Sequence, residues 1–171
     1  LIIVGFHIGY TLAYTNQTTE TLNEKFGWKG DDATLYQSLI GSVPVGSMMI
    51  SASLGGILIA RGRLKVLDLA AVIGIIGVAL TLVQNLWFIL VGRFWYGFST
   101  GLIAVAWPRY MEEVLPPANL SFFGGLYCFS FAIATIIAYL LALGLPLDTE
   151  KAELKKAEFW RVIFGLPILF Y

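Results

Sequence analysis

The sequence contains little charge, one cysteine and one histidine. Charged residues occupy 13% of its 171 positions, whereas a soluble domain carries about 25%. The lone cysteine, Cys128, excludes an internal disulfide and a multi-cysteine metal site. The 11 basic and 11 acidic residues cancel, which argues against a nucleic-acid partner because such proteins present a basic surface.

Residue patterns that typify enzymes are also missing. The sequence has no HExxH zinc motif, no Walker loop, no GxGxxG nucleotide loop and no serine–histidine–aspartate arrangement. The one histidine, His7, has no acidic residue near it in the sequence. The sequence therefore predicts a protein that is not an enzyme and that uses neither a metal nor a cofactor.

Hydrophobic residues, by contrast, make up 58% of the chain, and the mean hydropathy is +0.79. A helix needs about 20 mostly apolar residues to cross a bilayer, and barrel strands would alternate in polarity. The candidate spans are 1–15, 35–60, 66–84, 86–110, 120–146 and 159–171. We therefore predict an all-α, multi-pass integral membrane protein with six transmembrane helices, in a plasma or organelle membrane.

The connections indicate how these spans are joined. A polar loop is expected at 16–34, a short basic loop at 61–65, and a tight turn at Gln84-Asn85 that makes the third and fourth spans antiparallel neighbours. The pair Pro116-Pro117 should end the fourth span. Segment 147–158 is expected to form a short charged helix outside the membrane. Both chain ends fall within apolar runs, so we expect both to be truncated.

Small residues recur at helical spacing on three of the spans and predict close helix packing. The positions are Ser47, Ser51 and Gly55, Gly74 and Gly77, and Gly97 and Gly101.

Three polar side chains share one face of the first span. His7, Thr11 and Tyr14 follow one another at i, i+4 and i+7. A polar face on a membrane helix points to the protein interior or to a watered cavity. An imidazole titrates near neutral pH, so His7 either contacts a polar solute or carries a proton, or it bonds a neighbouring helix and orders the packing.

Arg93 lies about two turns into the fourth span. A guanidinium stays charged, so it must reach an interface, pair with an acid or face water. No acidic residue occurs between Asp68 and Glu112, so an acidic partner would come from elsewhere in the fold. Structural pairing and contact with a solute both remain open.

The fifth span carries Cys128 and Thr135 on one helical face. Cys128 is either a small hydrophobic residue in the packing or a contact for a solute.

The fourth span and its exit carry a longer motif. The residues are Gly92-Arg93-Phe94, Gly97, Gly101, and Pro108-Arg109-Tyr110-Met111-Glu112-Glu113-Val114-Leu115-Pro116. They resemble the signature of the sugar porters of the major facilitator superfamily. Three weaker motifs resemble the same family: Gly5-Phe6-His7-Ile8-Gly9, Gly56 followed by Arg61-Gly62-Arg63-Leu64-Lys65, and Trp160-Arg161.

This resemblance implies that residues 1–171 form the N-terminal six-helix half of a twelve-helix transporter, built as a 3+3 inverted repeat. It implies movement of a small polar, sugar-like solute by alternating access, as a uniporter or with protons. A missing C-terminal half would be needed. The implied partners are therefore the solute, the lipid bilayer and that second half or other subunits.

The resemblance also implies roles for individual residues. His7, Thr11, Cys128 and Thr135 would face the solute, with Arg93 near the outer mouth of the site. His7 stands where proton-coupled members of the family carry an acid, and Cys128 where a glutamine usually bonds the sugar.

The loops after the second and fourth spans would be cytoplasmic in such a protein, although the count of basic residues favours the opposite orientation. Arg61, Arg63 and Glu113 would then form an inner gate.

An alternative function is that of a non-transporting structural membrane subunit, derived from half of a transporter and retained in a larger complex. Three departures from the family pattern favour it: Ala60 in the basic loop, Leu120 where an arginine is expected, and Cys128.

Overall fold

The computed structural model describes residues 2–28, 30–60, 62–144 and 159–171. Within these residues every element is helical and no strand occurs. The elements are α1 (Ile2–Gln17), α2 (Thr19–Phe26), α3 (Asp31–Ile59), α4 (Arg63–Thr81), α5 (Leu86–Val114), α6 (Pro117–Ala142), α8 (Phe159–Gly165) and the 3-10 helix η1 (Leu166–Phe170). The predicted all-α class is thus confirmed.

Four of these helices, α3 to α6, are long and apolar enough to cross a membrane. The 16-residue α1 and the apolar stretch Phe159–Phe170 are shorter. Length and composition alone therefore establish four spans and leave the predicted count of six undecided. The predicted charged helix at 147–158 lies outside the described residues.

The predicted polar loop at 16–34 is wrong in part, because it contains the helix α2. This helix ends at Gly27, whose φ of 71° is left-handed and whose N–H bonds the carbonyl of Asn23. A helix of eight mostly polar residues is too short for its apolar spacing to be told from a loop in the sequence. The helix α3 also begins at Asp31, four residues early, because Asp31 and Asp32 favour the N-terminal end of a helix.

The helix of the fourth predicted span continues beyond the expected boundary at residue 110. It ends just before Pro116-Pro117, as those prolines predicted. The helix α5 continues to Val114, Leu115 is extended, and Pro117 opens α6 as a first-turn proline. The expected turn at Gln84-Asn85 is confirmed, and the side chain of Asn85 caps α5 by accepting a hydrogen bond from the Trp87 N–H at 3.0 Å.

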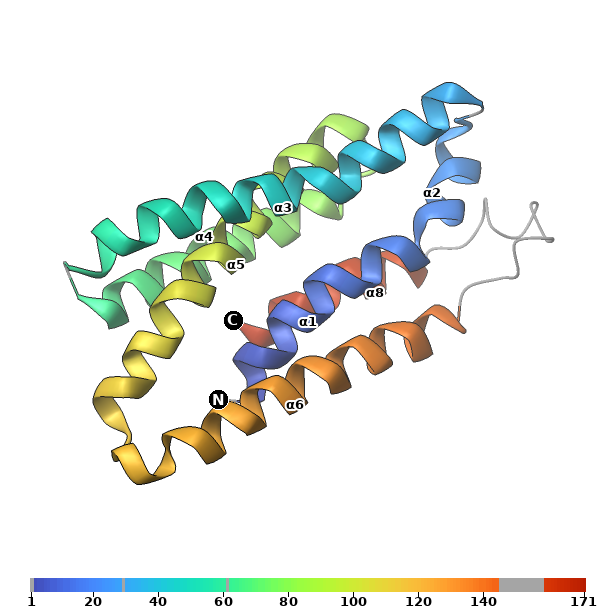
Figure 1. The fold of residues 1–171 in the computed structure, drawn as a ribbon. Helices are drawn as coiled ribbons and strands as arrows, with labels where there is room; N and C mark the ends of the chain where they lie inside the picture. Colours follow the sequence, from blue (N-terminus) through green and yellow to red (C-terminus); the bar gives the residue numbers. More distant parts are fainter. Residues whose placement is uncertain (1, 29, 61, 145–158) are drawn as a thin grey trace.

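The long helices form two packed groups, α3 to α5 and α1 with α6 (Figure 1). The groups are joined where α1 contacts α5 and where the C-terminal segment α8–η1 contacts both. The helix α5 lies against both α3 and α4, while α1 lies along α6. The segment α8–η1 contacts α1, α4 and α6. The turns α3–α4 and α5–α6 lie at one end of the bundle, and α2 lies at the other. This places α1, α5 and α8–η1 around a common interior.

The small-residue stripes on α3 and α5 pack against each other, which confirms the predicted close helix packing. A Cβ atom on Gly97 would lie 2.6 Å from the Cα of Pro44, and one on Gly101 would lie 2.9 Å from the Cα of Met48. Real Cβ atoms do not approach so closely, so only glycine permits this spacing of the two backbones.

Similar close approaches join the other helix pairs. A Cβ on Gly77 of α4 would lie 2.6 Å from the backbone nitrogen of Tyr96 in α5. One on Gly9 of α1 would lie 3.0 Å from the carbonyl carbon of Phe131 in α6. The glycines around His7 therefore bring α1 against α6 and leave the imidazole on another side of α1.

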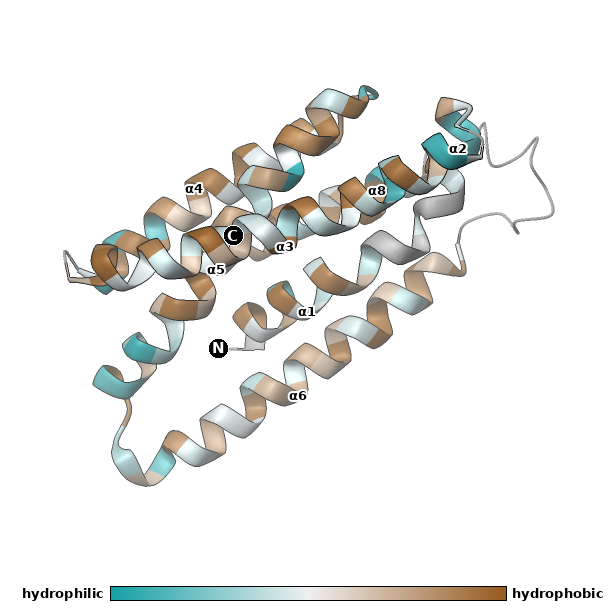
Figure 2. Cartoon of the chain, turned by 45° about the horizontal axis from the view of Figure 1, so that its top comes forward, coloured by the Kyte–Doolittle hydropathy of each residue, from teal (hydrophilic) through white to brown (hydrophobic). Residues whose placement is uncertain are grey.

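Hydrophobic residues run along the long helices, and hydrophilic residues gather in α2 and toward the helix ends (Figure 2). Large exposed hydrophobic residues include Met49 at 70%, Ile57 at 69% and Phe122 at 67%. Such a surface is stable in hydrocarbon rather than in water. The protein is an integral, multi-pass membrane protein.

Candidate functional site

A line of polar side chains lies between α1, α5 and Tyr171, inside this apolar exterior, and all of it is buried except Tyr171, which is partly buried. We call it the polar seam. Its members are His7, Thr11 and Tyr14 from α1, Arg93, Tyr96, Ser99 and Thr100 from α5, and Tyr171. The predicted inward orientation of the His7, Thr11 and Tyr14 face is confirmed, since each is at most 2% exposed.

His7 lies at the middle of the polar seam. Its Nε2 atom is 3.2 Å from Oγ1 of Thr100 and 3.0 Å from the hydroxyl of Tyr171. The rings of Tyr96 and Tyr171 meet the imidazole edge-on, at centroid distances of 5.3 and 4.6 Å. Its Nδ1 atom is buried and has no hydrogen-bond partner within the described part of the chain.

Thr11 continues the polar seam one turn further along α1. Its hydroxyl donates to the carbonyl of His7 at 2.7 Å and lies 2.6 Å from the hydroxyl of Tyr96. A threonine that bonds the carbonyl four residues earlier needs no neighbour for its proton. Its remaining lone pair therefore receives the Tyr96 hydroxyl across the interface.

Ser99 extends the polar seam to α4. Its hydroxyl donates to the carbonyl of Ala70 at 2.6 Å and lies 2.8 Å from the hydroxyl of Tyr171. Tyr171 thus bridges His7 of α1 and Ser99 of α5.

Arg93 is fully buried at the other end of the polar seam. Its guanidinium donates to the hydroxyl of Tyr14 at 2.9 Å. Its central carbon lies 4.5 Å from the Tyr14 ring centroid and 5.0 Å from that of Phe164. The negative faces of aromatic rings stabilise a cation in a dry site, so these contacts support the charge inside the bundle.

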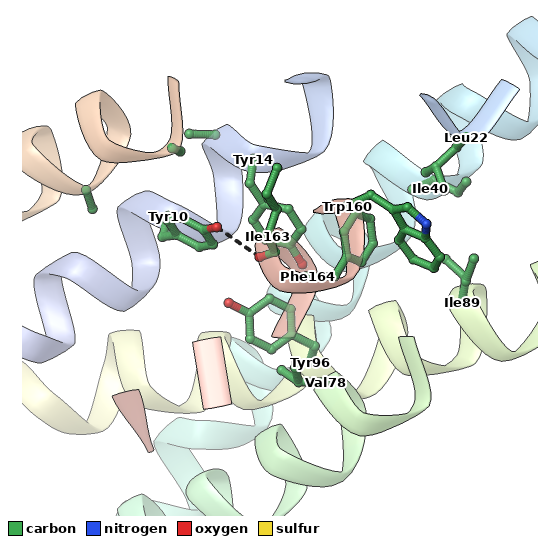
Figure 3. Packing of buried hydrophobic residues seen from close by; sticks show 13 residues of the cluster. Tyr10, Tyr14, Leu22, Ile40, Val78, Ile89, Tyr96, Trp160, Ile163 and Phe164 are labelled. Carbon is green, nitrogen blue, oxygen red and sulfur yellow. Dashed lines mark hydrogen bonds between the residues drawn. The ribbon is translucent and has the colours of Figure 1, made fainter. Parts of the chain in front are cut away.

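An aromatic cluster holds the C-terminal segment against these residues (Figure 3). Tyr10 donates to the carbonyl of Ile163 at 2.9 Å. That carbonyl lies four residues before Pro167, which has no N–H to return to it. The same proline changes α8 into the 3-10 turns of η1, and η1 leads directly to Tyr171.

Cys128 and Thr135 on α6 do not join the polar seam in this structure. Cys128 is exposed, and the Thr135 hydroxyl donates to the carbonyl of Phe131 in its own helix at 3.2 Å. Their predicted contact with a solute therefore stays a prediction.

Two of the three predicted gating residues, Arg63 and Glu113, lie at the end of the bundle that holds the α3–α4 and α5–α6 turns. Arg63 and Glu113 form an ion pair, with side chains 36% and 47% exposed. Arg109 and Glu112 form a second pair at 3.2 Å. Arg61, the third predicted member, lies outside the described residues.

Sequence analysis missed four members of the polar seam: Tyr96, Ser99, Thr100 and Tyr171. A signal for two of them was present, because Arg93, Tyr96 and Thr100 occur at i, i+3 and i+7 and so share a helical face with the buried arginine.

The chemistry of the polar seam is that of hydrogen bonding. It offers hydroxyls, one imidazole and one guanidinium in an apolar surround, which suits recognition of an uncharged solute rich in hydroxyls. Across the described residues, no three His, Cys, Asp or Glu side chains group as metal ligands would.

The chain matches a protein-family model described as "Sugar (and other) transporter" over residues 1–171. It is 31% identical to "Probable plastidic glucose transporter 2" of Arabidopsis thaliana, over 98% of this chain and 32% of that protein. It is 28% identical to "Sugar transporter ERD6-like 6" of the same plant, over 94% of this chain and 30% of the relative. It is 25% identical to "Hexose transporter 1" of Plasmodium knowlesi, over 98% of this chain and 36% of that protein.

Among solved structures, the chain is similar in fold to the crystal structure of a D-xylose–proton symporter. The TM-score is 0.80 at 19% sequence identity, and the match covers 99% of this chain and 44% of the other. The chain thus spans about a third of the length of the curated relatives it matches.

Proposed function

The chain belongs to the Sugar (and other) transporter family, and we propose from this premise that it forms the N-terminal half of a membrane transporter for a small, sugar-like solute. The first and sixth spans would be α1 and α8–η1, and the six would form a 3+3 inverted repeat. The whole protein would move its solute by alternating access with a C-terminal half. The members of this family are transporters, so no chemical conversion is involved.

The polar seam is the observation that carries this proposal. Polar side chains on membrane helices are expensive and point inward when they serve a solute path. Here they converge from α1, α5 and Tyr171 and hydrogen-bond one another across the interfaces between these elements. The names of the relatives, which refer to glucose and hexose transport, support a sugar as the solute class.

Of the two predicted solute contacts on α1, His7 and Thr11, the polar seam supports His7 better. His7 has one buried nitrogen without a partner in the described chain, whereas Thr11 has both its proton and a lone pair engaged. Thr11 would therefore position α1, and His7 would meet the solute or carry a proton. Cys128 and Thr135 would face the solute from α6, and Arg93 would lie at the mouth of the site.

The ion pair of Arg63 and Glu113 would act as part of the inner gate. It joins the first turn of α4 to the last turn of α5. Its partners are partly exposed, so they could separate at modest cost when this end of the bundle opens.

Uptake of labelled D-glucose and D-xylose into vesicles that contain the full-length protein tests the proposal. We expect saturable uptake that His7→Ala reduces, with a change in affinity or in the dependence on pH. An unchanged rate, affinity and pH profile in His7→Ala would remove His7 from the mechanism.

Absence of uptake for every sugar tested, in a folded protein that carries both halves, would favour the alternative of a structural membrane subunit. The exposed Cys128, in place of a sugar-bonding amide, is the feature of this chain that fits that alternative best.

A further inference from the structure

The hydrogen bonds of the polar seam have directions that can be worked out from its fixed acceptors. Backbone carbonyls only accept, and each serine, threonine or tyrosine hydroxyl has one proton to give. Two short contacts end on carbonyls, namely Ser99 to Ala70 at 2.6 Å and Thr100 to Tyr96 at 2.9 Å. Each requires a proton between its oxygens, so the protons of Ser99 and Thr100 are both committed.

Tyr171 must then donate to Ser99. The two hydroxyl oxygens lie 2.8 Å apart, which again requires one proton between them. The Ser99 proton already lies in the bond to the Ala70 carbonyl, so the proton of this contact comes from Tyr171. The Tyr171 oxygen consequently has only lone pairs to offer His7.

His7 therefore supplies the protons for both of its own contacts. Its Nε2 atom lies 3.0 Å from the Tyr171 oxygen and 3.2 Å from the Thr100 oxygen, and neither oxygen has a proton left. A nitrogen with a bare lone pair would face two lone pairs there, so Nε2 carries the hydrogen and shares it between them.

We infer that His7 is held as the Nε2–H tautomer, so that its buried Nδ1 atom is a hydrogen-bond acceptor and selects a donor group, such as a hydroxyl, on the solute. The selection of a donor group on the solute rests on the proposed function, whereas the assignment of the tautomer does not. Nδ1 is the nitrogen with no partner in the described residues, and a buried acceptor without a partner is costly. A solute hydroxyl would remove this cost, while a group that can only accept would meet repulsion.

The direction of the hydrogen bond between Thr11 and Tyr96 follows from the same argument. Thr11 gives its proton to the His7 carbonyl at 2.7 Å, so Tyr96 donates to Thr11 at 2.6 Å. The ring of Tyr96 meets the imidazole edge-on, but the proton of its hydroxyl is committed to Thr11 and does not compete for the lone pair of Nδ1.

Nitrogen-15 NMR of the full-length protein with labelled histidine tests the tautomer. The signals of His7 are identified by their loss in His7→Gln. We expect, at neutral pH, a protonated Nε2 and an unprotonated Nδ1. The reverse pattern would overturn the inference.

Ser99→Ala tests whether the hydrogen bonds from His7 to Tyr171 and from Tyr171 to Ser99, which we call the relay, set the tautomer. The substitution removes the acceptor that takes the Tyr171 proton. Tyr171 can then donate to Nε2, so the population should move toward the Nδ1–H form. The matched control is Ser47→Ala, a buried serine on α3 that bonds the carbonyl of Pro44. The absence of a shift in Ser99→Ala, or an equal shift in the control, would show that the relay does not set the tautomer.

Binding of D-glucose and its singly fluorinated analogues tests whether Nδ1 of His7 accepts a hydrogen bond from a solute hydroxyl, since a C–F group cannot donate. We call this second part of the inference the donor clause. We expect one position where fluorination weakens binding by about tenfold, the scale of one buried hydrogen bond left unmade. In His7→Ala the same substitution should lose this effect. A loss that is the same with and without the imidazole would overturn the donor clause.

The failure of the proposed function is distinguishable from these outcomes. If the full-length protein binds none of the sugars, both the proposed function and the donor clause fail for this solute class, while the NMR result still decides the tautomer.

Discussion

The helices α5 and α6 are similar in length and both can cross a membrane, yet they use their polar residues differently. In the most apolar 18-residue stretch of each helix, 56% of α5 is buried against 17% of α6. The hydroxyls of Ser99 and Thr100 on α5 reach other helices, whereas those of Ser130 and Thr135 on α6 bond only the α6 backbone in the described contacts.

This difference shows that α5 supplies much of the interior of the described bundle and that α6 supplies one of its faces. A polar group in hydrocarbon must be satisfied by its own helix or by a neighbour. The hydroxyls of Ser130 and Thr135 on α6 are satisfied locally, so they do not tie this helix to a neighbour. Those of α5 are satisfied across interfaces, so they fix the positions of α1, α4 and Tyr171.

The largest difference between the two helices is expected at their glycines. In Gly92→Ala, the new Cβ on α5 would lie 2.7 Å from the Gly77 carbonyl oxygen and 2.8 Å from the Thr81 nitrogen. These backbone atoms cannot yield as a flexible side chain could, so we expect a loss of about 3 kcal/mol. The apparent Tm of the purified full-length protein should fall by a few degrees.

Gly125→Ala on α6 is the matched control, because a Cβ there meets nothing within 4 Å. Alanine favours a helix over glycine by up to about 1 kcal/mol, so the Tm should stay constant or rise. A fall equal to that of Gly92→Ala would mean that another part of the protein packs on this face of α6.

The next effect concerns the two arginines of α5, one inside the bundle and one at its end. Arg93→Lys keeps the charge but loses the planar group that stacks on Tyr14 and Phe164. We expect a loss of about 2 kcal/mol, from the stacking and the altered bond to the Tyr14 hydroxyl. Thermal unfolding checks this, with the exposed Arg109→Lys as a control that should change the Tm very little. Equal effects would show that burial of Arg93 adds nothing.

Some of these features could be predicted from the sequence because they depend on local patterns. Long apolar runs gave the helices α3 to α6, and Pro116-Pro117 gave the break between α5 and α6. The helical spacing of His7 and Thr11 was enough to place them on a buried face. Each of these inferences uses residues within a few turns of one another.

Other features depend on contacts between distant residues and had no local signal. His7 and Tyr171 are 164 positions apart in the sequence. Spacing alone also could not say which neighbour a helical face meets. Cys128 and Thr135 share a face, as predicted, yet that face does not join the polar seam in the structure.

A smaller effect is expected when each helix loses one threonine hydroxyl. Thr100 and Thr135 both bond the carbonyl four residues earlier in their own helix, but the Thr100 hydroxyl also lies 3.2 Å from Nε2 of His7. Thr100→Val should therefore cost about 1 kcal/mol. Thr135→Val should be nearly neutral, because it loses only the local bond. Paired Tm measurements check this, and equal losses would contradict the proposed difference between α5 and α6.

The smallest effect is expected where α5 leaves the buried interior and ends at the ion pair of Glu113 with Arg63. Both side chains are more than a third exposed, and such pairs contribute about 0.2–1 kcal/mol. A double-mutant cycle with Arg63→Gln and Glu113→Gln should give a coupling of about 0.5 kcal/mol that falls as salt screens the charges. A coupling well above 1 kcal/mol that survives high salt would contradict this. It would mean that this end of α5 is enclosed like its middle, so that the contrast with α6 extends along the whole helix and opening the end would be costly.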